Sequence, residues 1–423
     1  METTDLIKKT DLRFNNVSTL IVKVTRRCNL DCTYCYENIV KDGDMSIETF
    51  RNLALKVFTS SQKSNITFIF HGGEPTLISN SFYEKAFDYC LDLCNKFNKT
   101  VSFNLQTNLL FLNSEKIELF KKYRVSIGAS LDSYMDDKES FRKGSNKFLR
   151  NFRFAKDNNL SVGVLSTINL SNYNNYNYFV SFLENDLKLN DFKANIVYSV
   201  GTGKFLPDIK PEMVFEAQKA ILDNMIKNKG YGLVEENLSS QIHRYFTDSD
   251  MQQNSLCHSK TCGAGDKVVG ITTEGDILPC GRFQWNDENY KLGSIKSEVN
   301  DFFQKVEVFH SKESQNWFNC ESCDAKKICN FGCQAFISRS QSKANVECLP
   351  TKMLFKYFIE NKQKLREVYE GLLDRKYIKI GAGYSDEKYG DYTKEPYNDT
   401  YSDKYSDNKY NDKYNDEKYS DTK

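Results

Sequence analysis

The chain has 423 residues, and its 58 Lys+Arg against 57 Asp+Glu leave a net charge of +1, which provides no global field for binding nucleic acid or an anionic membrane. No segment approaches the roughly 18 apolar residues that cross a bilayer, and Met1–Thr10 lacks the apolar stretch of a signal peptide. We therefore expect a soluble, cytoplasmic protein with no nucleic-acid or membrane partner. In a reducing cytosol its 13 cysteines predict metal binding rather than disulfides.

The first half of the chain alternates between two kinds of segment. Amphipathic stretches such as Ser46–Phe58 and Phe82–Phe97 predict helices. Short runs of β-branched and aromatic residues predict strands at Thr19–Val24, Ile66–Phe70, Val101–Leu105, Val125–Ile127, Val162–Ile168 and Asn195–Val200. Six strand–helix units predict an α/β fold with parallel strands, a partial (β/α)6 TIM-like barrel over residues 15–200 that follows an N-terminal extension, 1–14.

The second half is less regular. Residues 201–255 form a bridging region with a helical stretch around Val214–Lys227, and residues 256–350 are rich in cysteine. In the latter, Lys267–Thr273 and Ile277–Pro279 flank a Glu-Gly-Asp turn, which is typical of a β-hairpin. This module is too irregular for a large apolar core, so we expect bound metal to supply much of its cohesion.

The C-terminal part combines a predicted helix with a low-complexity tail. Apolar residues at helical spacing predict a helix over Thr351–Arg375, within a segment 351–378. Residues 379–423 repeat Tyr-x-Asp eight times and contain no aliphatic residue after Ala382. Such a segment cannot bury enough apolar surface to offset its ordering entropy, so we predict a disordered tail.

Three cysteines follow the first predicted strand. Cys28, Cys32 and Cys35 lie within eight residues, where α/β folds place active sites, at the C-terminal ends of strands. Three thiolates can hold one compact centre, and an iron–sulfur cubane, which normally takes four, would keep one iron open. The alternatives are cysteines without a ligand and a structural zinc site, for which the usual pair of CxxC knuckles is missing.

The CxxxCxxC spacing closely resembles that of the radical S-adenosylmethionine (SAM) enzymes. The resemblance implies that Cys28, Cys32 and Cys35 hold a [4Fe–4S] cluster. It also implies that SAM chelates the fourth iron through its amino and carboxylate groups, with Tyr36 beside the adenine.

Residues at the ends of later strands support this resemblance. Gly72-Gly73-Glu74-Pro75 follows the second strand and is similar to the GGEP motif that holds the SAM amino group, although a bare tetrapeptide of this kind is equally typical of a turn. Gln106 ends the third strand and is assigned to the same site. The family pairs a Ser at the end of strand four with a downstream Arg on the SAM carboxylate, which implies Ser130 and Arg142. An isolated Arg on a helix is usually just solvated.

A second cysteine set lies in the C-terminal module. Eight thiolates match two fully ligated cubanes, and two four-thiolate zinc sites are the alternative. The spacing resembles the SPASM extension of radical SAM enzymes. That resemblance implies an auxiliary cluster I held by Cys257, Cys262, Cys280 and Cys333, and an auxiliary cluster II held by Cys320, Cys323, Cys329 and Cys348. Of 13 cysteines, subtracting three and eight leaves Cys90 and Cys94, on the apolar face of a predicted helix, where we expect them in the core.

The family resemblance implies that a 5′-deoxyadenosyl radical removes hydrogen from a peptide or protein side chain. The favoured reaction is maturation of a small precursor peptide by crosslinking, through a thioether in preference to a carbon–carbon or ether linkage, as in maturases of clostridial Cys-rich peptides. The alternative is formylglycine formation by an anaerobic sulfatase-maturating enzyme, weakened because those enzymes place an Asp where this chain has Gly281, followed by Arg282. A non-catalytic iron–sulfur carrier is the alternative from another class. No catalytic base is identified.

Several partners follow from this interpretation. We expect an electron donor such as flavodoxin or ferredoxin. Too few residues precede the first strand for a separate peptide-recognition domain, so leader binding would use the barrel, the segment Gly201–Ser255 or a separate recognition protein. The Tyr-x-Asp tail is interpreted as a solvated tail, with precursor capture and self-modification as alternatives.

Overall fold

The computed structural model describes residues 11–134, 139–251, 257, 262–297, 301–313, 320, 322–329, 331–339 and 345–378. Its described strands form a single sheet in the order β10-β9-β8-β1-β2-β3-β4-β5-β6-β7. The first six strands pair in parallel with their neighbours. They are β1 (Thr19–Thr25), β2 (Asn65–Gly72), β3 (Thr100–Thr107), β4 (Ser126–Ser130), β5 (Val162–Ile168) and β6 (Asp191–Ile196). The α/β fold with a parallel sheet is confirmed.

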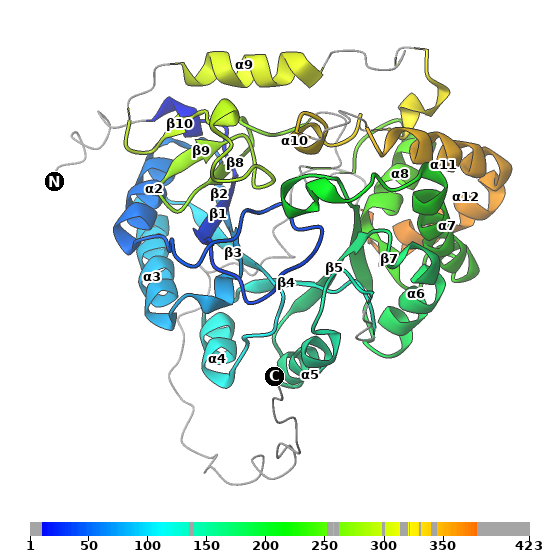
Figure 1. Cartoon of the computed structure of the whole chain (residues 1–423), viewed down its shortest axis with the longest axis horizontal. Helices are drawn as coiled ribbons and strands as arrows, with labels where there is room; N and C mark the ends of the chain where they lie inside the picture. The colour runs from blue at the N-terminus through cyan, green and yellow to red at the C-terminus, as the bar shows by residue number, and fades with distance from the viewer. Residues whose placement is uncertain are drawn as a thin grey trace, which may run out of the picture.

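Helices cover the outer face of this sheet. Figure 1 shows the strands in an arc, with α2 to α7 around its outside. On the outer face Phe68 and Phe70 of β2 pack with Phe103 of β3 and Phe87 of α3, and the Phe70 and Phe87 ring centroids lie 5.5 Å apart. The opposite face is left for the site. The helices are α2 (Ile47–Ser60), α3 (Asn80–Phe97), α4 (Ser114–Lys122), α5 (Ser145–Asp157), α6 (Tyr176–Asn185) and α7 (Pro211–Lys227).

Most predicted elements agree with the structure, and one strand is displaced. The helices expected at 46–58 and 82–97 correspond to α2 and α3, and Cys90 and Cys94 of α3 are buried in the core as predicted. The strand predicted at Asn195–Val200 is wrong in its bounds, because β6 ends at Ile196. The apolar residues beyond it, Tyr198 and Val200, instead pack against Phe336 of the cysteine-rich segment.

The cysteine-rich segment continues the same sheet. The predicted hairpin is present as β8 (Val268–Ile271) and β9 (Asp276–Leu278), with Gly275 at φ +92° in the turn. Strand β8 pairs in parallel with β1, which was not predicted, and β10 (Gly293–Ser294) pairs with β9. At the other edge β7 (Val234–Glu235) pairs with β6. The pairing of β8 with β1 places the hairpin that precedes Cys280 beside the strand that precedes Cys28.

Further helices complete the described part of the chain. The single helix predicted at Thr351–Arg375 is wrong, because Asn361 interrupts it with a backbone ψ of 23°. No described helix has the length and apolar character needed to span a membrane, and the Tyr-x-Asp tail lies outside the described residues. The α-helices are α8 (Glu236–Thr247), α9 (Phe302–Glu313), α10 (Gln334–Ile337), α11 (Cys348–Glu360) and α12 (Lys362–Asp374). The short 3-10 helices are η1 (Leu12–Phe14), η2 (Pro75–Leu77), η3 (Tyr173–Asn175), η4 (Gly201–Phe205), η5 (Glu288–Tyr290) and η6 (Asp324–Lys327).

Candidate active site

The first three cysteines lie in the loop that leaves β1 at the C-terminal edge of the sheet. Burial raises the pKa of the Cys28 thiol to about 11 and that of the Cys35 thiol to about 12, and the neighbouring Cys32 contributes to both rises. The Leu30 amide donates to Cys28 Sγ at 3.4 Å, and Asn108 Nδ2 lies 4.0 Å from the same sulfur. Three thiols thus share one partly buried loop with N–H donors beside it.

The predicted GGEP turn packs directly against this loop. The Gly73 amide donates to Thr25 O at 2.9 Å, and the Glu74 amide donates to Arg27 O at 2.7 Å. A Cβ on Gly73 would lie 2.1 Å from Arg27 O, and one on Gly72, at φ +124°, would lie 2.2 Å from Thr25 O. The two glycines therefore allow the turn to approach the cysteine loop closely.

Glu74 is the most enclosed acid of the site. Its carboxylate Oε1 accepts hydrogen bonds from Thr76 and Thr107, and Oε2 accepts the Asn108 amide at 2.7 Å. Burial raises its pKa, and these hydrogen bonds oppose the rise. The carboxylate is fixed at the junction of β2 and β3, beside Asn108, which also contacts Cys28.

The remaining predicted SAM residues lie at the ends of β3 and β4. Gln106 Nε2 donates to Ser130 Oγ at 3.0 Å. Arg142 pairs with Asp132, Nε to Oδ2 at 3.3 Å, and donates to the Tyr34 hydroxyl at 3.0 Å. The sequence indicated neither Asp132 nor Tyr34 as a partner of Arg142, because nothing in their spacing relates them.

Polar residues face the concave side of the sheet beyond Cys35. Lys23 of β1 forms a buried ion pair with Glu37 and donates to Phe283 O. Tyr36, predicted beside an adenine, has its hydroxyl 3.5 Å from Nε2 of His71 and donates to Gly281 O at 3.2 Å. Burial lowers the pKa of His71 to about 3, so this imidazole is neutral.

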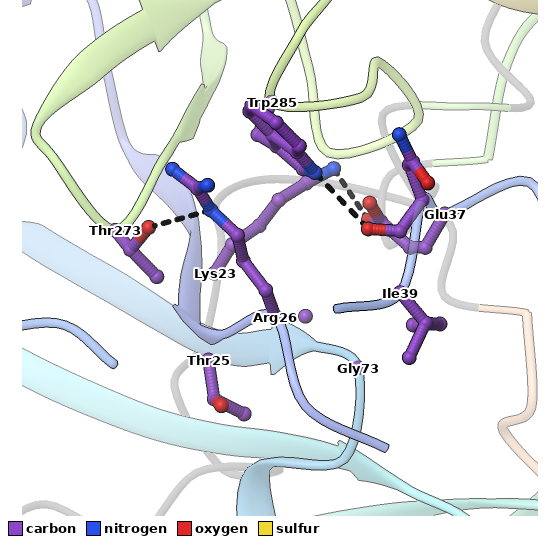
Figure 2. Close-up of a pocket in the computed structure, with 10 residues that line it drawn as sticks. Lys23, Thr25, Arg26, Glu37, Ile39, Gly73, Thr273 and Trp285 are labelled. Atoms are coloured by element: carbon purple, nitrogen blue, oxygen red, sulfur yellow. Dashed lines mark hydrogen bonds and ion pairs between the residues drawn. The ribbon is translucent and has the colours of Figure 1, made fainter. Parts of the chain in front are cut away.

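A pocket of about 240 Å³ opens between the first cysteine loop and the β8–β9 hairpin. Figure 2 shows the Lys23–Glu37 pair at one side and the Arg26 side chain between Thr273 and Trp285. The Arg26 guanidinium lies 3.8 Å from the Trp285 ring centroid. Gly72 and Gly73 also line the pocket, so it borders the GGEP turn.

Part of the second cysteine set gathers around Arg282. Burial raises the pKa of Cys280 to about 12, and Cys333 and Cys257 contribute to this rise. The positive charge of Arg282 opposes the rise in the pKa of both Cys280 and Cys333. Cys262, which was predicted to belong with Cys257, Cys280 and Cys333, lies in the segment that precedes β8.

The other four cysteines of that set form a separate group. Cys323 precedes η6, Cys329 follows it, and Cys348 begins α11. Burial raises the pKa of Cys348, as do the neighbouring charges of Cys320 and Cys323, and Cys348 in turn raises the pKa of Cys329. These charge couplings relate the four residues that the family resemblance grouped, and their assignment to one cluster stays a prediction.

A short segment from Gly281 to Trp285 connects the two cysteine sets. Trp285 Nε1 donates to Asn38 O at 3.0 Å, and Gln284 Nε2 donates to Tyr36 O. Together with the bonds to Gly281 O and Phe283 O, these contacts fasten the residues after Cys280 to those after Cys35. Arg282 extends from this segment to Asn195, its NH2 lying 3.4 Å from Oδ1.

The candidate donor sets consist of cysteine thiols, the ligand type that iron–sulfur clusters take. Within the described ranges no three His, Cys, Asp or Glu side chains are arranged to bind one metal ion. A cubane needs a wider arrangement, because each thiolate binds its own iron. Protonated thiols grouped in partly buried loops fit a centre that binds thiolates and releases their protons.

Comparison with known proteins identifies the first module. Residues 22–185 match the model of the Radical SAM superfamily. The chain therefore contains a radical SAM domain, which confirms the resemblance drawn from the CxxxCxxC spacing.

Curated relatives extend beyond that domain. A cysteine-type anaerobic sulfatase-maturating enzyme of Clostridium novyi is 26% identical over 75% of this chain and 88% of its own length. A serine-type anaerobic sulfatase-maturating enzyme of Bacteroides thetaiotaomicron is 24% identical over 72% of this chain and 80% of its own length.

Solved structures share the fold. A structure of anSMEcpe with bound AdoMet has a TM-score of 0.66 at 19% identity, covering 84% of this chain and 93% of that chain. Streptococcus suis SuiB bound to its precursor peptide SuiA has a TM-score of 0.55 at 16% identity, covering 80% and 76%. The similarity therefore includes most of the C-terminal region as well as the barrel.

Proposed function

We propose that this chain is a radical SAM enzyme that oxidatively modifies a peptide, with a [4Fe–4S] cluster held by Cys28, Cys32 and Cys35. The observation that carries the proposal is the meeting of this cysteine loop with Glu74, Ser130 and Arg142 at one edge of the parallel sheet, inside a radical SAM domain. When bound together, the cluster and SAM supply a 5′-deoxyadenosyl radical after accepting one electron. The protein binds, orients and excludes water around it.

The chain's own residues divide the binding of SAM among them. Glu74 accepts its ammonium group, and Arg142 and Ser130, held by Gln106, bind its carboxylate. Asp132 orients Arg142. One of its carboxylate oxygens contacts Arg142, and the other accepts a hydrogen bond from the Thr167 amide at 2.8 Å, which holds the carboxylate in place. Tyr36 shields the adenine side of the site.

The second cysteine set is proposed to hold two auxiliary [4Fe–4S] clusters. Cys257, Cys262, Cys280 and Cys333 hold the first; Cys320, Cys323, Cys329 and Cys348 hold the second. The two groups of thiols described above support this division. We also propose the domain boundaries given above, with residues 256–350 as the SPASM module.

Thioether formation is the reaction we favour. One substrate C–H and one cysteine S–H are broken and one C–S bond is formed, so the substrate loses two electrons and two protons. The radical from bound SAM would take one hydrogen atom, a cluster held by the second cysteine set would accept the second electron, and the thiol proton would pass to solvent. A precursor peptide is the substrate, and a flavodoxin or ferredoxin supplies the initial electron in the cytoplasm.

Formylglycine formation is the second candidate, because curated relatives from two genera carry that activity in their names. Those enzymes are expected to place an Asp at the position of Gly281. Here a Cβ on Gly281 would lie 2.3 Å from Cγ2 of Ile21, so the site has no room for that side chain. This steric limit is why we favour crosslinking.

One anaerobic experiment separates the candidates. The reconstituted full chain is incubated with SAM, dithionite and either the peptide encoded beside its gene or a sulfatase-derived cysteine peptide. In each reaction the modified peptide and 5′-deoxyadenosine are analysed by mass spectrometry. Loss of two hydrogens with sulfur retained supports crosslinking, whereas replacement of sulfur by oxygen supports formylglycine formation. Absence of 5′-deoxyadenosine with fully loaded clusters would refute both and favour an electron carrier.

A further inference from the structure

Arg244 is a buried cation without adequate partners in the described structure. It lies in the last turn of α8, and its side chain is only 1% exposed. Its Nε and NH1 atoms have no hydrogen-bond partner among the described residues. Its ion pair with Asp250 is long, at 4.0 Å, and the Asp250 side chain is 30% exposed. Burying a guanidinium on these terms is costly, so a nearby anion is expected.

The surroundings of Arg244 indicate where that anion lies. The ring of the adjacent Tyr245 contacts the Lys327 ammonium at 5.8 Å and the Phe358 ring at 5.5 Å. Lys327 ends η6, two residues before Cys329, and Phe358 belongs to α11, which begins at Cys348. Figure 1 shows α8 beside α11 and α12.

The electrostatic coupling agrees with this placement. Burial raises the pKa of the Cys329 thiol to about 11, and the charge of Arg244 acts against that rise. Cys329 in turn opposes the effect of burial on the pKa of Arg244. The guanidinium is thus a buried cation on the helix that packs, through Tyr245, against the elements next to Cys329 and Cys348.

We infer that Arg244 is the internal countercharge of the iron–sulfur cluster held by Cys320, Cys323, Cys329 and Cys348. The inference rests on the proposed function, which assigns a [4Fe–4S] cluster to these residues. Four thiolates and an oxidised cubane carry a net charge of about −2, and reduction adds one more negative charge. A buried cation with unpaired N–H donors stabilises the reduced state more than the oxidised state, which raises the reduction potential.

An exposed lysine near the same cysteines provides a matched control. Lys352 lies four residues after Cys348 and acts on the pKa of that thiol, but its side chain is exposed to solvent. Water and salt screen its field, whereas that of Arg244 acts through the protein interior. Replacing either residue by methionine removes one positive charge, so the comparison isolates the effect of burial of that charge on the reduction potential.

The test is a potentiometric titration of the anaerobically reconstituted full chain, followed by electron paramagnetic resonance. The relevant transition is the one that disappears in Cys329→Ala. We expect Arg244→Met to lower the equilibrium constant for its one-electron reduction at least tenfold, or about 59 mV. Arg244→Lys should return it to within about threefold of the original value, and Lys352→Met should change it less than about threefold, because the buried charge is what acts.

The possible results separate this inference from the proposed function. Loss of about four irons in Arg244→Met but not in Arg244→Lys would also support it, because the charge would then be needed to retain the cluster. No shift in Arg244→Met, or equal shifts in the Met and Lys variants, would overturn the countercharge role alone. An unmodified chain that holds about four irons and has no Cys329-dependent signal would overturn the auxiliary-cluster assignment and this inference together.

Discussion

Replacing Gly73 by alanine is the most direct perturbation of the contact between the GGEP turn and the cysteine loop. The new Cβ would lie 2.1 Å from Arg27 O, where real Cβ atoms essentially never approach below 3.0 Å, so the two loops must separate by at least the difference, 0.9 Å. The opposing atom is backbone and cannot rotate away. The displacement stretches the bonds from Gly73 to Thr25 and from Glu74 to Arg27.

The expected cost follows from these contacts. Two backbone hydrogen bonds contribute about 1 kcal/mol each, and forced overpacking costs about 1–3 kcal/mol, so Gly73→Ala should destabilise the protein by about 3–5 kcal/mol. The same movement displaces Glu74 relative to Cys28. We therefore also expect SAM affinity to fall, by about tenfold for each 1.4 kcal/mol of the strain that remains in the bound state.

Gly163→Ala is the matched control. Gly163 lies in β5, and a Cβ there meets nothing within 4 Å. Alanine at that position should be neutral or stabilising by up to about 1 kcal/mol. Thermal unfolding and equilibrium dialysis with SAM measure both variants, and the reasoning is refuted if Gly73→Ala matches Gly163→Ala in stability and affinity.

Three further predictions follow from single contacts. Asp132→Asn should cost about 2–4 kcal/mol of unfolding free energy, because it leaves the partly buried Arg142 without its buried partner, and the Arg142→Met double mutant should recover part of this loss. Burial lowers the pKa of His71 to about 3 in the folded protein, from 6.5 in the unfolded chain. The stability that the neutral imidazole contributes is therefore complete above pH 6.5 and is lost as the pH falls from 6.5 toward 3, by about 1.4 kcal/mol per pH unit. The unfolding free energy of His71→Gln should lack this pH dependence. Cys28→Ser should lose about four irons per chain, whereas Cys90→Ser, in the core, should lose stability and no iron; equal iron contents would contradict the division of the cysteines.

Local patterns predicted those elements whose cause is local. Period-two and helical spacing identified β1 to β5 and the helices α2 and α3, because alternate burial of strands such as β2 is visible in the residues themselves. The strand β6 was displaced toward Val200, since apolar residues that pack against Phe336 look the same in sequence as residues that pair in a sheet. The break at Asn361 was missed because apolar spacing continues across it.

The same distinction between local patterns and contacts made only by the fold applies to the residues of the site. Cysteine spacing and the GGEP motif are local and were recognised, but the partners of Arg142 were not. Asp132 lies ten residues before Arg142 and Tyr34 lies 108 residues before it, and only the fold brings them together. Arg244 was also missed, because its significance depends on burial and on unpaired donors, which one sequence does not display.

The segment from Gly281 to Trp285 explains why chemistry without a base at position 281 suits this chain. Its backbone and side chains form hydrogen bonds with Lys23, Tyr36 and Asn38, which fix the position of the residues after Cys280 relative to the first cysteine loop. That close fit places Gly281 against Ile21 and leaves no room for a carboxylate there. Oxidation of a carbinol or thiol carbon to an aldehyde needs a proton removed next to the radical, whereas a substrate thiol can lose its proton to solvent before the C–S bond forms. The steric limit at Gly281 is therefore the reason for which we propose the second reaction rather than the first.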